Sequence, residues 1–112
     1  MKKVSLDQLE PYKAPQHFDF AGLKLHGKEE TGVQKFRIGL SYFLPGGGTE
    51  YLGEDSPQDR VVFVLEGQVT IKTKKEEVTL GPMDSVYLAP NEGREIINRT
   101  KKPASMLVIT SY

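Results

Sequence analysis

The chain has 112 residues and carries 15 basic and 15 acidic side chains, which gives a formal net charge of zero. This length provides one domain with a real core and leaves no room for a second. A chain without net charge has no overall field that attracts nucleic acid or anionic lipid, so we expect neither as a partner.

Three features that the sequence lacks exclude further classes of function. The N-terminus lacks the apolar run of a signal peptide and no segment reaches the length of a membrane span, which favours a soluble cytoplasmic protein without a membrane partner. Cysteine is absent, so disulfides, thiolate catalysis and zinc–thiolate sites are excluded. His17 and His26 are the only histidines, which excludes a site built on three imidazoles, and we interpret each as a surface or structural histidine.

The first half of the chain alternates apolar and polar residues in two stretches. Residues 1–16 mix apolar, charged and proline residues, and we expect an N-terminal arm or an edge strand that contacts a second copy. Residues 17–28 predict two strand pieces joined by a tight turn at Ala21-Gly22. Residues 33–44 have a clear period of two and predict the longest strand, which Pro45-Gly46-Gly47-Gly48 then ends in a turn.

The second half contains shorter strand signals. Arg60–Gly67 places five consecutive apolar residues before a Glu-Gly turn signal and predicts a core strand buried on both faces. Because this strand begins with an arginine, its guanidinium must lie at a water-filled mouth or pair with an acid. Residues 69–80 predict a hairpin, and residues 85–89, 94–98 and 105–111 predict three further strands.

About ten short strands with Gly/Pro turns and no convincing helix predict an all-β, antiparallel fold. Such a chain must protect the edges of its sheet, which favours a closed or double-sheet barrel or jelly roll.

Three segments together resemble the small single-domain cupins: Leu44-Pro45-Gly46-Gly47, the strand end VFVLEG at 62–67, and MDSVYLAPNEGREIIN at 83–98. The resemblance covers roughly residues 39–98 and includes both halves of the cupin signature. It implies a double-stranded β-helix barrel over residues 1–112 that often forms a homodimer.

This sequence departs from the metal-binding cupins at every expected ligand. The first motif of that family supplies two histidines and a glutamate, and the second motif supplies a further histidine. Alignment on the motifs places Glu54 and Ser56 at the first two positions and Arg60 and Arg94 at the others. A guanidinium stays protonated and has no lone pair to give, so we predict no histidine-ligated metal and no cofactor. A divalent metal held by Glu50 or Glu54 with His26 is the remaining alternative.

If these substituted residues point into the barrel, they form a cluster with net positive charge. Arg60 and Arg94 are suited to bidentate capture of a carboxylate, so we predict a small organic anion as the ligand. Tyr42 and Asn98 complete the predicted ligand-binding set. Glu54 orients an arginine or serves as a catalytic general base. The carbon part of the ligand would lie against an inward row of Val62, Val64 and Ile96.

Three other hypotheses stay open. Glu54 could bridge the two arginines in an ion-pair network that fills the former metal site and binds nothing. The protein could instead be an isomerase, epimerase or lyase, in which Glu54 or a tyrosine moves a proton and the arginines stabilise an enolate-like intermediate. It could also be an interaction module that works through an exposed sheet face and its N-terminal arm.

Overall fold

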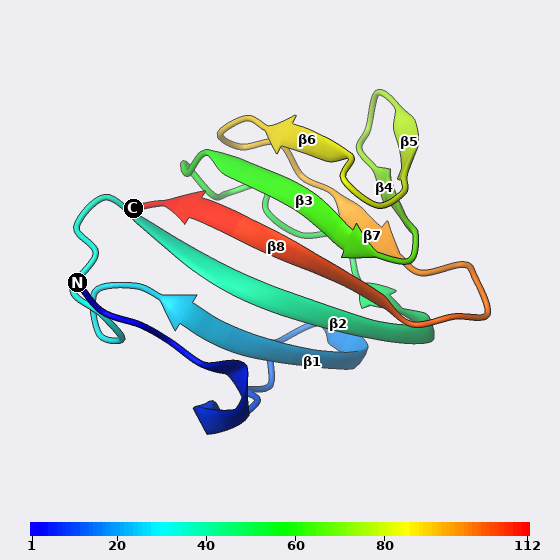
Figure 1. Cartoon of the computed structure of the whole chain (residues 1–112). Helices are drawn as coiled ribbons and strands as arrows, with labels where there is room; N and C mark the ends of the chain where they lie inside the picture. The colour runs from blue at the N-terminus through cyan, green and yellow to red at the C-terminus, as the bar shows by residue number, and fades with distance from the viewer.

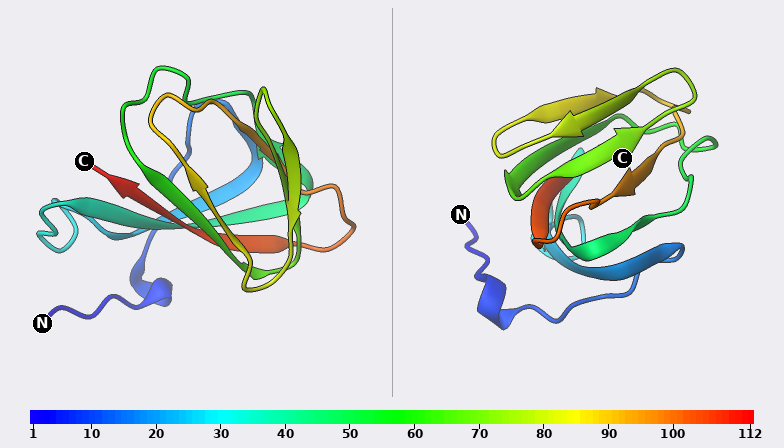
Figure 2. Two further views of the ribbon diagram at one scale, coloured as in Figure 1. Left: turned by 90° about the horizontal axis from the view of Figure 1, so that it is seen from above. Right: turned by 90° about the vertical axis from the view of Figure 1, so that its right-hand side faces the viewer.

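The computed structural model describes residues 1–112 as eight strands and one short 3-10 helix, η1 (Leu6–Gln8). The strands are β1 (His17–His26), β2 (Phe36–Thr49), β3 (Arg60–Glu66), β4 (Val69–Lys72), β5 (Glu77–Leu80), β6 (Ser85–Leu88), β7 (Glu95–Ile97) and β8 (Ala104–Ser111). All pairings are antiparallel, in the order β5-β4-β7-β2-β8-β3-β6, with β1 added on β2 (Figure 1). The sheet rolls into a nearly closed barrel (Figure 2), which confirms the predicted fold class. No helix is long and apolar enough to cross a membrane.

Strand β2 pairs with more strands than any other in the barrel and is longer than predicted. It pairs with β1, β7 and β8, and it continues through Pro45-Gly46-Gly47-Gly48, so the predicted turn there is wrong. A Cβ on Gly47 would stand 2.4 Å from the Asp19 carbonyl oxygen, and one on Gly48 would stand 2.1 Å from the Ile96 carbonyl oxygen. The glycines therefore let the backbones of β1 and β7 approach β2 closely.

Strand β1 is continuous, so the predicted turn at Ala21-Gly22 is also wrong. Its register on β2 shifts between Phe18 and Phe20 and again between Lys24 and His26. The N-terminal arm fastens to this strand through Tyr12, whose backbone N–H donates to the Gly22 carbonyl oxygen at 2.9 Å. A Cβ on Gly22 would stand 2.7 Å from the Tyr12 ring, so the glycine makes room for that ring.

The hydrophobic core occupies one end of the barrel. Its buried members are Phe43, Val62, Val64, Val69, Ile71, Leu80, Leu88, Ile96, Ala104 and Met106. On β3, Val62 and Val64 are buried while Val61 is 36% exposed, so the prediction that this strand is buried on both faces is wrong for its outer face. Alternation therefore governs β3 in spite of its unbroken apolar run.

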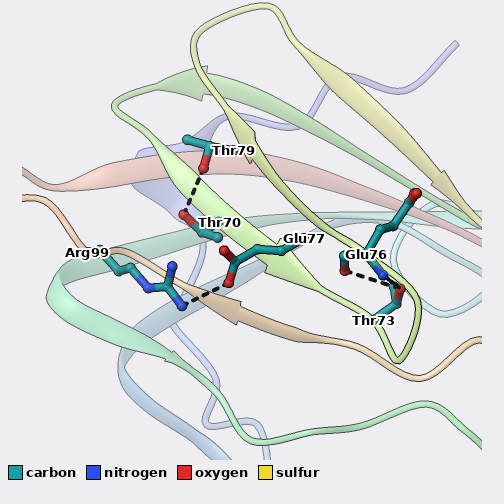
Figure 3. Close-up of polar contacts among 6 residues, drawn as sticks. All are labelled: Thr70, Thr73, Glu76, Glu77, Thr79 and Arg99. Carbon is teal, nitrogen blue, oxygen red and sulfur yellow. Dashed lines mark hydrogen bonds and ion pairs between the residues drawn. The ribbon is translucent and has the colours of Figure 1, made fainter.

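The predicted hairpin at residues 69–80 is confirmed as β4–β5. Thr70 and Thr79 face each other across it with their hydroxyl oxygens 3.2 Å apart (Figure 3). At the tip, the Glu76 N–H donates to the Thr73 hydroxyl at 3.2 Å. On the surface nearby, Arg99 Nη2 donates to Glu77 Oε1 at 3.1 Å. These contacts are remote from the open end of the barrel, where the cavity lies.

Candidate anion-binding site

The open end of the barrel encloses a cavity of about 570 Å³. It lies where β2 and β3 begin and β8 ends, and the N-terminal arm and β1 form one wall. Its lining includes the charged or polar side chains of Arg37, Arg60, Arg94 and Thr110 and the apolar side chains of Val62, Ile96, Met106 and Val108. The cavity therefore has a cationic part and a hydrocarbon wall.

Arg60 and Arg94 share one corner of this cavity, although they lie 34 residues apart in the sequence. Arg60 opens β3, and its Nη2 donates to Ser56 Oγ at 2.9 Å and to Gln58 Oε1 at 3.3 Å. Arg94 precedes β7, and its backbone exchanges two hydrogen bonds with Leu52. A Cβ built on Gly53 would stand 2.7 Å from Arg94 Nη1 and 3.6 Å from Arg60 Nη1, so both guanidinium groups flank the same point.

No carboxylate neutralises this corner. The ion pairs of the chain are Lys74–Glu54 and Arg99–Glu77, both at the surface. The Arg94 Nε is buried and has no hydrogen-bond partner. The pKa of Arg94 is lowered to about 10, mainly by burial and secondly by the charge of Arg60. The pKa of Arg60 is also lowered, mainly by burial and secondly by the charge of Arg37. The corner therefore carries positive charge that the protein itself does not compensate.

Glu54 does not belong to the cavity, and its predicted place in the barrel is wrong. It is exposed and pairs with Lys74 beside a shallow surface cleft that Tyr51, Asn91 and Glu92 also line. The chain turns at Gly53, which has φ of +93°, and carries Glu54 outward. The hypothesis of an ion-pair network bridging Arg60 and Arg94 through Glu54 is therefore wrong as well.

Tyr42 and Asn98 also lie outside the cavity. Tyr42 is 39% exposed, because alternation along β2 turns the inward-facing Ser41 and Phe43 to the interior and Tyr42 to the outer face. Asn98 is fully buried, and its Nδ2 donates to the carbonyl oxygens of Phe43, Leu44 and Lys102 at 3.2, 3.3 and 2.7 Å. Its Oδ1 accepts from Thr100, so the side chain has no group left for a ligand.

Sequence reasoning missed Tyr12 and Arg37, which line the cavity. His17 and His26, interpreted from the sequence as surface or structural histidines, line it as well. The His17 Nδ1 lies 2.8 Å from the Pro15 carbonyl oxygen. Because a carbonyl only accepts, Nδ1 donates in this contact, which leaves Nε2 as the ring nitrogen that faces other partners. The His26 Nδ1 lies 3.0 Å from Thr31 Oγ1. Burial raises the pKa of Tyr12, and the charge of Arg37 opposes that effect. The sequence feature that could have indicated the cavity is the pair of small residues Gly39 and Ser41, which lie on the same face of β2 as Arg37.

The residues present do not fit the metal centre of metal-binding cupins. Two of the four expected ligand positions hold arginines, which repel a cation and have no lone pair to give. No three His, Asp or Glu side chains come together in an arrangement that could hold a metal ion.

A nearly closed antiparallel barrel with a polar cavity at one end defines a small β-barrel protein of the cupin class. The family model for the cupin domain matches residues 39–110, and the chain belongs to this family. The suspected family and fold are therefore confirmed.

Among known proteins, the chain is 35% identical to the β-D-galactosidase Rv1717 of Mycobacterium tuberculosis over 112 residues, which is 100% of this chain and 95% of the relative. It superposes on the polyketide cyclase RemF of Streptomyces resistomycificus with a TM-score of 0.86 and 17% identity, covering 99% of this chain and 79% of that one. A sugar phosphate isomerase of the cupin superfamily from Silicibacter pomeroyi gives a TM-score of 0.82 and 24% identity, covering 99% and 76%. These two structures support the fold alone.

Proposed function

We propose that the cavity binds a small organic anion, whose carboxylate or phosphate lies between Arg60 and Arg94 without a resident metal. The observation that carries the proposal is the pair of guanidinium groups at one corner with no acid beside them and with the Arg94 Nε unpartnered. An anion would offset the charge and accept the missing hydrogen bond, and both effects favour binding.

The other walls indicate the rest of the ligand. Val62, Ile96 and Met106 offer apolar contact for a carbon skeleton, whereas the hydroxyl of Thr110 offers polar contact. A hydroxylated acid, such as a sugar acid, matches both kinds of wall.

Isothermal titration with a panel of small hydroxy acids and phosphates tests the proposal. We expect Arg94→Gln and Arg60→Gln to weaken the binding of the best anion by about 10- to 100-fold, because each removes a charge-assisted hydrogen bond. Arg99→Gln is the matched control, since it removes the same charge from a surface pair remote from the cavity. Equal binding by Arg94→Gln and the unmodified protein would refute the proposal.

A second candidate is a proton-transfer enzyme of the isomerase, epimerase or lyase type, and His17 favours it. Its Nε2 is the basic atom of a neutral imidazole that lines the same cavity as the arginines. It would take a proton from the carbon next to a bound carboxylate, while the arginines stabilise the enolate that forms. Glu54, the base predicted from the sequence, is too far outside the cavity for this role.

Deuterium exchange distinguishes this enzyme from a binding protein. In D2O, an enzyme would exchange the hydrogen next to the carboxylate of a bound acid, as followed by proton NMR. His17→Gln should abolish the exchange and leave binding within a few-fold. Binding without any exchange would make the protein a binder only.

The relative named as a β-D-galactosidase raises glycoside hydrolysis as a third candidate. That reaction generally needs two carboxylates that flank the scissile bond. The cavity offers Glu29 and Glu30, which are adjacent in an exposed turn at its mouth. An assay with a chromogenic galactoside tests this candidate, and Glu29→Gln with Glu30→Gln should abolish any activity it finds.

We also propose that the protein is a homodimer, joined through the outer face of β2, β8, β3 and β6. This face exposes four large side chains, Phe36 (42%), Tyr42 (39%), Val61 (36%) and Tyr87 (60%), which a second copy would cover. Light scattering after size exclusion should give the mass of two chains, and Val61→Glu should shift it to one.

A further inference from the structure

The cavity carries a second group of cations, at its mouth rather than in its inner corner. Arg37 on β2 and Lys24 on β1 both line the cavity. We infer that they form a second anion-binding subsite, so that the ligand carries two acidic groups. This inference rests on the proposed function, because it places the second acid relative to the one held by Arg60 and Arg94.

The register of three neighbouring strands sets the spacing of the two subsites. Arg37 of β2 pairs with Thr110 of β8, and Thr110 pairs with Arg60 of β3, so the three residues form one row. All three line the cavity. Adjacent strands lie about 4.8 Å apart, which puts the Cα atoms of Arg37 and Arg60 about 10 Å apart. Two long side chains reaching inward from these positions can hold the two ends of a short chain, with the Thr110 hydroxyl between them.

Lys24 supports Arg37 from the next strand. It pairs with Gly39, two residues along β2 from Arg37, and its Nζ lies 5.1 Å from the centre of the Tyr12 ring. Neither Arg37 nor Lys24 forms an ion pair within the chain. Two pKa shifts agree with this placement. The pKa of Arg60 is lowered by burial and then by the charge of Arg37, and the charge of Arg37 opposes the burial that raises the pKa of Tyr12.

The acids near the mouth do not cancel this group. Glu29 and Glu30 line the mouth, but five cations line the same cavity: Lys24, Lys28, Arg37, Arg60 and Arg94. The Glu30 carboxylate lies over Gly27, where an added Cβ would meet its Oε1 at 2.4 Å and the Tyr112 hydroxyl at 3.1 Å. A ligand with one acidic group would occupy the inner corner and leave Arg37 without a partner. A dianion would engage both ends.

Two matched pairs of acids test the inference at constant ionic strength, which holds the screening of charges fixed. Succinate and butyrate have the same number of carbons and differ in the second carboxylate. Phosphoglycerate and glycerate differ in a phosphate, so the two pairs distinguish which acidic group the mouth takes. Titrations use the unmodified protein and the variants Arg37→Gln, Arg37→Lys, Arg94→Gln and Arg99→Gln, with circular dichroism as the check on folding.

We expect the unmodified protein to bind at least one dianion about 10-fold more tightly than its matched monoanion, since a second charge-assisted contact is gained. Arg37→Gln should reduce that preference to about twofold, because it weakens dianion binding more than monoanion binding. Arg37→Lys should keep part of the preference, and Arg99→Gln should keep all of it. Monoanion binding that depends on Arg94 without a preference for either dianion would overturn this inference alone. Failure of every acid to bind would overturn the proposed function too.

Discussion

The two ends of the barrel use the same strands but differ in the residues that face inward. At the packed end, Phe43 of β2, Val64 of β3 and Ala104 of β8 are each at most 2% exposed. At the open end the same faces of these strands present Arg37, Arg60 and Thr110, which line a cavity. The change occurs within six residues on each strand.

The transition on β2 explains why the cavity exists. Between Phe43 and Arg37 the inward positions are Ser41 and Gly39, which are too small to reach across the barrel. Close-packed interiors do not tolerate large voids among apolar side chains, so an open end must be polar and wet. The comparison indicates that the packed end stabilises the fold, whereas the unpaired charges at the open end destabilise it.

The packed end should show the largest effect on stability. Phe43 is 1% exposed, and its ring centre lies 5.5 Å from that of Phe20. Phe43→Ala should lower the free energy of unfolding by about 3–5 kcal/mol, because it removes buried apolar surface and leaves a cavity. Urea denaturation measures the change. Phe43→Leu, a milder variant, should keep the anion affinity of the unmodified protein. A large loss of affinity in Phe43→Leu would mean that the two ends are not independent.

The fold was predictable because its signals are local. Strand alternation, turn residues and the cupin-like motifs each concern a few consecutive residues, and together they specify an antiparallel barrel. The meeting of Arg60 and Arg94 was predicted from the resemblance to cupins, whose two motifs place these positions at one site. Gly46, Gly47 and Gly48 were misinterpreted because glycine marks both a turn and a close approach of two backbones, and only the neighbouring strands distinguish them.

Most of the site was not predictable, for two physical reasons. Alternation along β2 separates two faces but does not say which is inside, and Tyr42 was assigned to the wrong one. The loop that contains Glu54 has no periodicity, so only its turn at Gly53 decides where the carboxylate goes. The approach of His17 and Tyr12 to the arginines depends on the pairing of β1 with β2 and on the path of the N-terminal arm, both of which are long-range contacts.

At the open end, removing a charge should stabilise the protein while it weakens anion binding. The pKa of Arg94 in the folded chain is about 10, below its ordinary value. Protonated Arg94 therefore destabilises the folded state relative to the unfolded state at every pH below 10. Arg94→Met should therefore raise the free energy of unfolding by about 1–3 kcal/mol at pH 7 without ligand, an order of magnitude for a shift of this size. The difference from the unmodified protein should shrink as the pH rises above 10, where Arg94 loses its proton.

Thermal or urea unfolding at pH 7 and above pH 10 checks this expectation. Arg99→Met is the control, because it breaks a surface ion pair and should change stability by at most about 1 kcal/mol at either pH. Added phosphate should stabilise the unmodified protein more than Arg94→Met, since only the former keeps the complete corner. If Arg94→Met were less stable than the unmodified protein and phosphate still stabilised it, then Arg94 would form an ion pair with a carboxylate of the protein in solution.

The smallest effect is expected at Glu54, the residue that the sequence placed in the barrel and the structure places on its surface. Glu54→Gln breaks an exposed contact with Lys74, and exposed ion pairs contribute little to stability because water solvates both partners. Unfolding, anion affinity and any deuterium exchange should all match the unmodified protein within error. Because Arg94→Gln removes one charge from the cavity and Glu54→Gln removes one from the surface cleft, the two variants compared in one titration separate the corner from the cleft. A loss of binding in Glu54→Gln would require the loop at Gly53 to turn inward when a ligand arrives, and would return Glu54 to the site.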